Sequence, residues 1–229
     1  MKIGFTGIDL PEEKIKYSDE HLIALVKKDN PKKVSPYYAE FVRDEFVQVE
    51  AIVVPKNNIL DLLILDMEMI DNRLGRLDDG DEKELLVKCM NILEEEVPLC
   101  DAVFDDEEKT LLKTLSPLSS KPVLQIDGDE DVNTIITLVL EKADYMFFYT
   151  SGPQESHAWL IKKDSDIVTC AAKIHSDLAR GFIKGDVVLP KDYLSCHNLN
   201  ECRSKGLVKL VDRDYIVQPG EIIEIRFNV

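Results

Sequence analysis

The sequence predicts an α/β protein that carries an inserted antiparallel helical hairpin and ends in a smaller domain of strands around a helix. Three observations support this prediction. Short apolar segments alternate with helical segments on both sides of a long helical stretch, and within that stretch apolar residues recur at spacings of three and four. After residue 143 the pattern changes to a pair of strands, a helix and further strands. We therefore expect three parts: residues 1–58 with 119–143, residues 59–118, and residues 144–229.

The composition is that of a folded protein in a reducing compartment. The chain has 229 residues, of which 45% are hydrophobic and 31% are charged. Its longest apolar runs fall far short of the ~20 residues that span a bilayer, and its first residues lack a signal peptide's apolar stretch. Five cysteines form no close sequence pairing. We expect a cytoplasmic protein with no membrane partner.

The negative charge is concentrated in one part of the chain. The net charge is −16, with 17 Lys+Arg against 32 Asp+Glu in residues 1–143 but 11 against 12 in residues 144–229. Nucleic-acid backbones attract a positive field, so the overall charge argues against a DNA partner. The change in balance also indicates a domain boundary near residue 144.

The N-terminal part predicts short strands and helices in alternation. Residues 2–6 form an apolar segment that ends at Gly7, and residues 19–28 have the apolar face of a helix with Ser18 as its N-cap. The other expected elements are strands in residues 39–42, 46–54 and 121–126 and a helix in residues 132–141.

The middle of the chain predicts a coiled-coil hairpin. A seam with spacings of 4, 3, 4 and 3 runs through Leu63, Met67, Ile70, Leu74 and Leu77. Residues 78–81 (DDGD) interrupt this seam, and Leu85, Cys89 and Ile92 resume it. A short acidic turn between two such stripes favours an antiparallel pair, followed by a short helix in residues 106–115. Cys89 and Cys100 are expected in the core.

The last 86 residues predict a β-grasp, ubiquitin-like domain. Strands are expected in residues 145–150 and 158–162, followed by a helix whose face carries Ile167, Ala171, Ile174 and Leu178. An extended segment at residues 182–189, a helix at 191–205 and strands at 207–210, 215–217 and 222–227 complete the domain.

Several motifs in fixed order resemble the YchF-type (Obg-like) P-loop NTPases. Residues 147–152 (FFYTSG), 174–177 (IHSD), 180–183 (RGFI) and 226–229 (RFNV) resemble the TGS domain that closes those proteins. Residues 63–66 with 73–74 resemble the family's helical insert, residues 121–124 its strand before the base-recognition loop, and residues 30–34 and 40–42 its switch region. The family's nucleotide-binding domain is considerably longer. The resemblance therefore implies a truncated P-loop NTPase-like sheet, the helical hairpin and a C-terminal TGS domain.

The phosphate-binding loop of that family is degenerate in this sequence. Such a loop needs glycines whose N–H groups surround the phosphates, a Lys for charge and a Ser or Thr for magnesium. Laid on the family motif from Gly7, the positions of the second Gly, the Lys and the Ser are Glu12, Glu13 and Lys14. A carboxylate and a phosphate ~4 Å apart repel by about 4 kcal/mol at an effective dielectric constant of ~20.

The other nucleotide motifs are also altered. Arg43 and Asp44 occupy the place where the family carries the acid that organises magnesium, and Gly128 occupies the position of the Asn that reads the base. The resemblance with these departures predicts a non-catalytic YchF-like binding or regulatory protein without a nucleotide cofactor. The alternative is a YchF-type ATPase or GTPase that retains ATP or GTP binding with magnesium through altered contacts.

Two metal hypotheses are weak. Asp127, Asp129 and Asp131 alternate as in a calcium loop, but Val132 and Leu138 stand where such a loop needs Gly and Glu. A solvated acidic turn is the simpler interpretation.

A zinc site is the second hypothesis. Cys196, His197 and Cys202 are close in sequence, yet zinc normally takes four ligands and no CxxC pair is present. We expect structural cysteines and no metal.

A basic stretch in the C-terminal domain is the candidate partner-binding site. It consists of Lys162, Lys163, Lys173, Arg180 and Lys184, together with His175 on a family motif position. Lys173 and Arg180 are seven residues apart, about two helical turns along one side. The resemblance to TGS domains of translation-associated proteins implies contact with RNA, the ribosome or a translation-associated protein. A solvated surface, with His175 as a capping or packed residue, remains the alternative.

Overall fold

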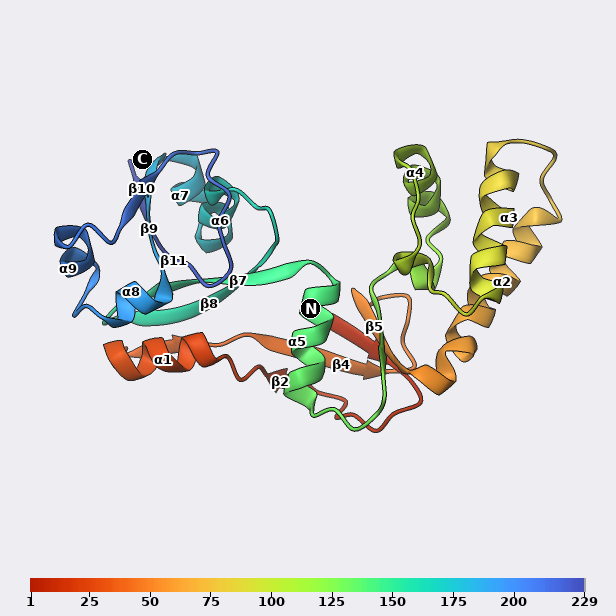
Figure 1. The fold of residues 1–229 in the computed structure, drawn as a ribbon, viewed down its shortest axis with the longest axis horizontal. Helices are drawn as coiled ribbons and strands as arrows, with labels where there is room; N and C mark the ends of the chain where they lie inside the picture. The colour runs from red at the N-terminus through yellow and green to blue at the C-terminus, as the bar shows by residue number, and fades with distance from the viewer. Residues whose placement is uncertain (229) are drawn as a thin grey trace. The chain divides into compact units, whose positions relative to one another are not determined.

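The computed structural model describes residues 1–228 and contains two compact α/β units, each with its own sheet (Figure 1). Unit 1 comprises Met1–Ile15 and Ala39–Ala143, and unit 2 comprises Lys16–Tyr38 and Asp144–Val229. Val229, the last residue of the RFNV motif, lies outside the described residues. Within residues 1–228, no helix combines the length and apolarity needed to cross a membrane.

The sheet of unit 1 has five strands in the order β2-β4-β1-β5-β6. The strands are β1 (Lys2–Phe5), β2 (Lys14–Lys16), β4 (Tyr38–Arg43), β5 (Ala51–Pro55) and β6 (Val123–Ile126). Strands β4, β1, β5 and β6 are parallel, with Ile3 opposite both Phe41 and Ala51. All five residues of β5 are buried, as expected for a central parallel strand. Helix α5 (Val132–Lys142) buries Ile135, Ile136, Val139 and Leu140.

Strand β5 begins later than the sequence predicted. Residues 46–50 form a turn in place of a strand. The Glu45 carboxylate accepts hydrogen bonds from the backbone N–H groups of Val47 and Gln48 at 2.8 and 3.0 Å, which holds the turn and lowers the Glu45 pKa. A side chain that bonds its own local backbone competes with strand pairing.

The predicted helical hairpin is present in unit 1. Helices α2 (Ile59–Leu74) and α3 (Asp81–Glu94) lie side by side and share one hydrophobic core cluster (Figure 1). Near the tip, Arg73 Nε donates to Glu82 Oε1 at 2.7 Å. Buried Asp66 accepts from the N–H groups of Leu118 and Ser119, which fixes the single turn η3 (Leu118–Ser120) against α2. The remaining elements are turns η1 (Lys56–Asn58) and η2 (Leu99–Asp101) and helix α4 (Asp106–Leu115).

The sheet of unit 2 has six strands in the order β10-β9-β11-β7-β8-β3. The strands are β3 (Lys33–Ser35), β7 (Tyr145–Ser151), β8 (Glu155–Lys162), β9 (Phe182–Val188), β10 (Lys209–Val211) and β11 (Ile222–Phe227). Strands β7 and β8 form an antiparallel hairpin, and helix α6 (Ile167–Ile174) packs Ile167, Cys170 and Ala171 into the core with Phe148. The order of hairpin, helix and further strands agrees with the sequence prediction.

Two predicted helices of unit 2 are each divided in the structure. The first breaks at His175, which is extended and separates α6 from α7 (Ser176–Arg180). The predicted helix at residues 191–205 is instead α8 (Pro190–Leu194) and α9 (Leu199–Ser204), because the Asn198 side chain accepts from the Glu201 N–H and starts a new helix. The predicted strand at 215–217 contributes only an isolated bridge between Ile216 and Asp166.

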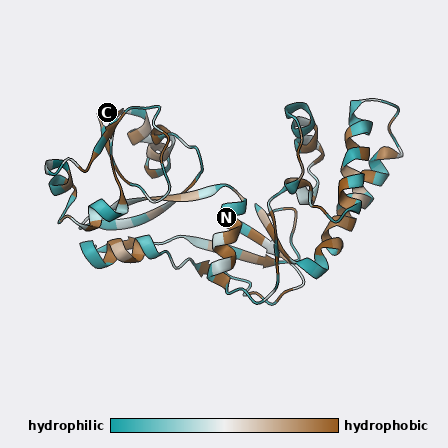
Figure 2. Cartoon of the chain, viewed as in Figure 1, coloured by the Kyte–Doolittle hydropathy of each residue, from teal (hydrophilic) through white to brown (hydrophobic). Residues whose placement is uncertain are grey.

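Residues 16–38 belong to unit 2, which corrects their expected place in the N-terminal domain. Strand β3 pairs in parallel with β8, with Val34 opposite Ser156. Helix α1 (Glu20–Asp29) has a hydrophobic middle between hydrophilic ends (Figure 2), and it buries Leu22 and Leu25 in one cluster with Tyr149. The apolar face of α1 is thus covered by unit 2.

Two buried or part-buried aspartates fasten α1 to strand β7. Asp19, and not the predicted Ser18, is the N-cap: its Oδ1 accepts from the Leu22 N–H at 3.1 Å, and its Oδ2 accepts from the Tyr149 hydroxyl at 2.7 Å. At the other end, Asp29 Oδ2 accepts from the hydroxyls of Ser151 and Tyr193 at 2.6 and 2.8 Å. Burial beside these carboxylates raises the pKa of both Tyr149 and Tyr193.

We predict that removing the Asp19 contacts destabilises unit 2. Asp19→Ala loses an N-cap and leaves the buried Tyr149 hydroxyl without its acceptor, so the free energy of unfolding should fall by about 2–4 kcal/mol. Trp159, the single tryptophan of the chain, lies on β8 and reports urea unfolding of unit 2 by fluorescence. Lys173→Ala is the exposed control, expected within about 0.5 kcal/mol of the wild type. Equal midpoints for the two variants would contradict the prediction.

Two fully buried thiols make stability sensitive to alkali. Cys89 on α3 and Cys170 on α6 are fully buried, and burial raises their pKa to about 11 and about 12. An unfolded thiol has a pKa of about 8.5, so the folded state favours the protonated form. This stability is fully present below that pH and is lost as the pH rises toward 11.

We therefore expect Cys89→Val to flatten the loss of stability between pH 8 and pH 10. The wild-type thiol should contribute about 1–2 kcal/mol of that loss, which valine cannot contribute because it does not ionise. Urea unfolding followed by circular dichroism at the two pH values measures the difference. An identical pH dependence in the variant would show that Cys89 ionises equally easily in the folded protein.

Candidate functional site

The altered nucleotide motifs gather at one edge of the unit 1 sheet. Strands β1, β4 and β6 are parallel members of this sheet, so their carboxyl ends share an edge. Gly7 follows β1, Arg43 ends β4, and Gly128 follows β6. Open α/β sheets bind ligands beyond the carboxyl ends of their strands. The structure thus brings these three sequence-predicted positions to the edge where a nucleotide site would lie.

The segment after β1 does not have the form of a phosphate-binding loop. Residues 6–13 form an irregular loop that leads into strand β2, so no helix N-terminus follows Gly7. Gly7 has φ +69°, and an added Cβ would lie 3.2 Å from atoms of Asn58 and Pro55. Lys14 lies on β2, where its Nζ is 3.8 Å from Glu40 Oε2. The backbone donors that a phosphate loop draws from a helix start are therefore not supplied by this segment.

Arg43 closes this loop with its own side chain. Its Nε donates to Glu12 Oε1 at 2.9 Å, and its Nη2 donates to Asp9 Oδ1 at 3.3 Å. Nη1 donates to the Ile8 carbonyl at 3.3 Å, and the guanidinium lies 5.0 Å from the centre of the Phe5 ring. The hydrogen bond to Glu12 and the nearby carboxylates raise the Arg43 pKa. A cation thus joins the loop at the position where the resemblance places a metal-organising acid.

Glu13 and Asp44, the other predicted positions in this part of the edge, form backbone hydrogen bonds. Glu13 accepts from the Phe41 N–H through its backbone carbonyl at 3.1 Å. Asp44, at φ +53°, donates its N–H to the Phe5 carbonyl at 2.8 Å. Both residues therefore act through the backbone in holding β2 and β1 beside β4.

The turn after β6 is closed by local contacts as well. Glu130 accepts from the N–H groups of Asp127 and Gly128 at 3.0 and 2.9 Å, which lowers its pKa. Asp127 pairs with Lys56 Nζ at 2.7 Å. Gly128 has φ +101° and offers no side chain to read a base. Asp131 caps α5 by accepting from the N–H groups of Asn133 and Thr134.

The cysteines and acidic residues form no metal centre in the described part of the chain. Residues 1–228 hold no group of three or more His, Cys, Asp or Glu side chains arranged to bind a metal ion. Cys196 and Cys202 are buried in the cluster that contains Tyr193, and burial raises the Cys202 pKa to about 11. His197 donates its N–H to the Glu201 carboxylate. The three residues therefore have packing and local hydrogen-bonding roles.

The predicted basic residues of unit 2 lie on β8, α6, α7 and β9 and, for Lys163, in the turn after β8, and several are paired. Lys163 Nζ is 3.6 Å from Asp144, Arg180 is 2.9 Å from Asp177, and Lys184 pairs with Asp212. The Lys162 ammonium lies 4.0 Å from the centre of the Tyr145 ring. Exposed ion pairs contribute only about 0–1 kcal/mol, so a phosphate can replace the carboxylate partner at small cost.

His175 has a structural contact. Its Nδ1 accepts from the Asp177 N–H at 3.1 Å and caps α7. Lys173 is exposed on α6. His175 is therefore a helix-capping residue, which was one of the alternatives expected from the sequence.

Residues 16–38 add to the charge of unit 2, which their position in the sequence did not indicate. With this segment, unit 2 holds 16 Lys+Arg against 15 Asp+Glu, whereas unit 1 holds 12 against 29. The net charge is therefore +1 for unit 2 and −17 for unit 1. In the described part of the chain, Lys16, Lys27 and Lys32 have no carboxylate within 4.0 Å. The apolar face of α1 was the available signal, because it required a partner surface that residues 1–58 alone did not identify.

Comparisons with known proteins agree with the sequence resemblance. The family model YchF-GTPase_C, described as a protein of unknown function (DUF933), matches residues 145–228. The chain is 28% identical over 260 residues to the ribosome-binding ATPase YchF of Bacillus subtilis, covering 82% of this chain and 71% of that protein. It is 37% identical over 82 residues to human Obg-like ATPase 1, covering 36% of this chain and 21% of that protein.

A solved structure shares the fold. The YchF GTPase of Schizosaccharomyces pombe superposes with a TM-score of 0.80 at 16% sequence identity, covering 99% of this chain and 97% of that chain. At this level of identity, the similarity establishes the fold alone.

Proposed function

Because the chain belongs to the YchF-type (Obg-like) family, we propose that it is a non-catalytic, ribosome-associated binding protein whose nucleotide site has been lost. The observation that carries the proposal is the loop after β1. It leads into a strand and is held by Arg43, Glu12 and Asp9 where the family places phosphates and magnesium. ATP, GTP and magnesium therefore enter only under the alternative of residual nucleotide binding.

The charges at the sheet edge oppose a nucleotide. A triphosphate that approached Arg43 would have to displace Glu12 and Asp9, and both carboxylates would then face the phosphates without a counter-ion. Repulsion between these carboxylates and the phosphates would come on top of the missing helix start. The remaining charge of unit 1, −17 in total, adds to the same field. Phosphoryl transfer depends on positioned phosphates and metal, so loss of binding removes catalysis.

A shortened nucleotide-binding domain also fits the sequence comparison. The match to the Bacillus subtilis protein runs over 260 positions, more than the 229 residues of this chain. The segment between β1 and α1 is the part that would contain the phosphate loop and its helix. We infer that the shortening removed these elements and left the truncated sheet, the helical hairpin and a TGS-like unit 2.

The ribosome is the partner that the comparisons favour. Relatives are named ribosome-binding ATPases, and the family match lies in unit 2. In this proposal, Lys162, Lys163, Lys173, Arg180 and Lys184 contact ribosomal RNA phosphates, with His175 holding α7 in place. Unit 2 has a net charge of +1, so it repels RNA phosphates far less than the net charge of −16 for the whole chain suggests. Such a role places the protein in the cytoplasm.

Calorimetry tests the loss of nucleotide binding. We expect no saturable binding of ATP or GTP up to millimolar concentrations, with or without magnesium, because the loop supplies neither backbone donors nor an unpaired cation. Asp9→Asn with Glu12→Gln removes the repelling charges while retaining the loop, and it should still bind no nucleotide. Micromolar, magnesium-dependent binding by the wild type would establish the alternative.

Co-sedimentation with ribosomes tests the proposed partner. Lys162→Glu with Lys163→Glu and Arg180→Glu should weaken association at least about tenfold and reduce its dependence on salt, because fewer phosphate contacts release fewer counter-ions. The matched control places Lys109→Glu and Lys113→Glu on α4 of unit 1, where association should not change. Failure of the wild type to sediment would contradict ribosome association, and equal sedimentation of both variants would contradict this surface.

A further inference from the structure

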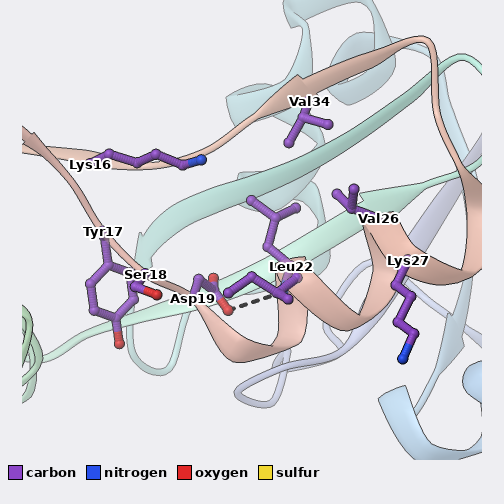
Figure 3. A pocket seen from close by; sticks show the side chains of 9 residues that line it. Lys16, Tyr17, Ser18, Asp19, Leu22, Val26, Lys27 and Val34 are labelled. Carbon is purple, nitrogen blue, oxygen red and sulfur yellow. Dashed lines mark hydrogen bonds between the residues drawn. The ribbon is translucent and has the colours of Figure 1, made fainter.

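Helix α1 and strand β3 enclose an apolar groove within unit 2 (Figure 3). Val34 on β3 points toward the side of α1 that carries Leu22 and Val26 (Figure 3). Leu22 is buried, but Ile23 is 57% exposed and Val34 is 39% exposed, and both line the groove. Adjacent exposed aliphatic side chains in a groove are typical of an interaction site.

Lysines surround this apolar floor. Lys16 and Lys27 line the groove, and Lys32 lies in the connection between α1 and β3. In the described part of the chain none of the three has a carboxylate within 4.0 Å, although the sequence holds 44 acidic against 28 basic residues. The one acidic lining residue, Asp19, is already engaged by Leu22 and Tyr149. The groove therefore combines an apolar floor with unneutralised positive charge, which selects an acidic ligand.

The edge of β3 adds backbone hydrogen-bonding groups. β3 is the terminal strand of its sheet and pairs only with β8 in that sheet's strand order. Lys33 donates its N–H toward β8, to the Gln154 carbonyl at 3.1 Å. Because backbone groups alternate along a strand, the N–H and C=O of Val34 face the opposite, open edge. An extended peptide can pair with such an edge and place alternate side chains in the groove.

We propose that this groove binds an extended acidic segment of a partner protein. Its backbone pairs with Val34, its aliphatic side chains contact Ile23 and Val34, and its carboxylates approach Lys16 and Lys27. The floor favours a peptide over RNA, because aliphatic side chains do not stack on bases and the Tyr17 ring already stacks on Phe147 with centres 5.6 Å apart. This site is separate from the residues proposed to contact the ribosome.

Fluorescence polarisation with a designed peptide tests the groove. The probe is fluorescein-labelled ITETITETI, which places isoleucine and glutamate in turn on one face of an extended strand and threonine on the other, and the protein is the full chain. Saturable binding is expected, and it should weaken at least about tenfold with Ile23→Ser and with Lys16→Glu plus Lys27→Glu. The matched control is Ile183→Ser plus Lys209→Glu, since Ile183 is 53% exposed on β9 and Lys209 is exposed on β10, at the other end of the sheet from β3, and neither should affect binding. Trp159 fluorescence in urea checks that every variant is folded.

Altered probes distinguish the proposed contacts. A peptide with lysine in place of each acidic residue should not bind, and neither should a peptide N-methylated along one backbone edge, whereas methylation of the other edge should leave binding intact. Equal binding of the wild type and both groove variants would overturn the proposal.

Two other occupants are tested in the same experiment. Displacement of the peptide by single-stranded RNA that is insensitive to Ile23→Ser would assign the groove to nucleic acid and overturn the proposal. Self-association in sedimentation that is lost with Lys16→Glu plus Lys27→Glu would assign it to a second copy of the chain and also overturn it. Ribosome co-sedimentation is measured separately, so failure of one proposal does not affect the other.

Discussion

The hydrogen bond from the Tyr149 hydroxyl to the buried carboxylate of Asp19 joins residues 16–38 to the rest of unit 2. Asp19 is 5% exposed and accepts both this hydroxyl and the N–H of Leu22. A buried carboxylate is stable only where such donors replace water. Together with Asp29, which accepts from Ser151 and Tyr193, it commits residues 16–38 to the sheet of unit 2. The chain between β2 and β4 is therefore unavailable to build a nucleotide site in unit 1.

At the carboxyl edge of the unit 1 sheet, charged side chains of opposite sign pair with one another. Arg43 would be an unpaired cation without Asp9 and Glu12, and those carboxylates would repel each other without Arg43. The same reasoning applies to Lys56 and Asp127. A single substitution toward the family motif would leave an uncompensated charge in either pair. If the nucleotide site is lost as we propose, regaining it would require coordinated changes in the loop and at Arg43, as well as a helix after Gly7.

Local sequence patterns predicted most of the helices and strands, because the spacing of apolar residues within a short segment indicates its secondary structure. The seam through Leu63, Met67 and Ile70 predicted the hairpin, whereas the common edge of Gly7, Arg43 and Gly128 is visible only in the structure. Parallel strands place their carboxyl ends together, so the edge follows once the pairing of β4, β1, β5 and β6 is known.

The predictions that were wrong depend on contacts between residues that are distant in sequence, or on side chains that cap a helix. β3 pairs with β8, which is more than 100 residues away, so no local pattern indicated that Val34 lies opposite Ser156. Short polar side chains also changed element ends: Asp19 caps α1 in place of Ser18, and Asn198 divides the predicted helix of residues 191–205. The pairing of Lys184 with Asp212 likewise depends on how β9 and the following strands meet.

The rotation of α1 about its axis explains why apolar and basic side chains coexist in the groove. Asp19, Leu22 and Asp29 are all held against the sheet, which fixes one face of the helix inward. Ile23 follows Leu22 by about 100° around the helix, and Lys27 is one turn beyond Ile23 on that same flank. Burying Ile23 would therefore rotate both aspartates away from their hydroxyl donors. Its exposure beside Lys27 is a consequence of the contacts that hold unit 2 together, so a partner can cover this flank without disturbing them.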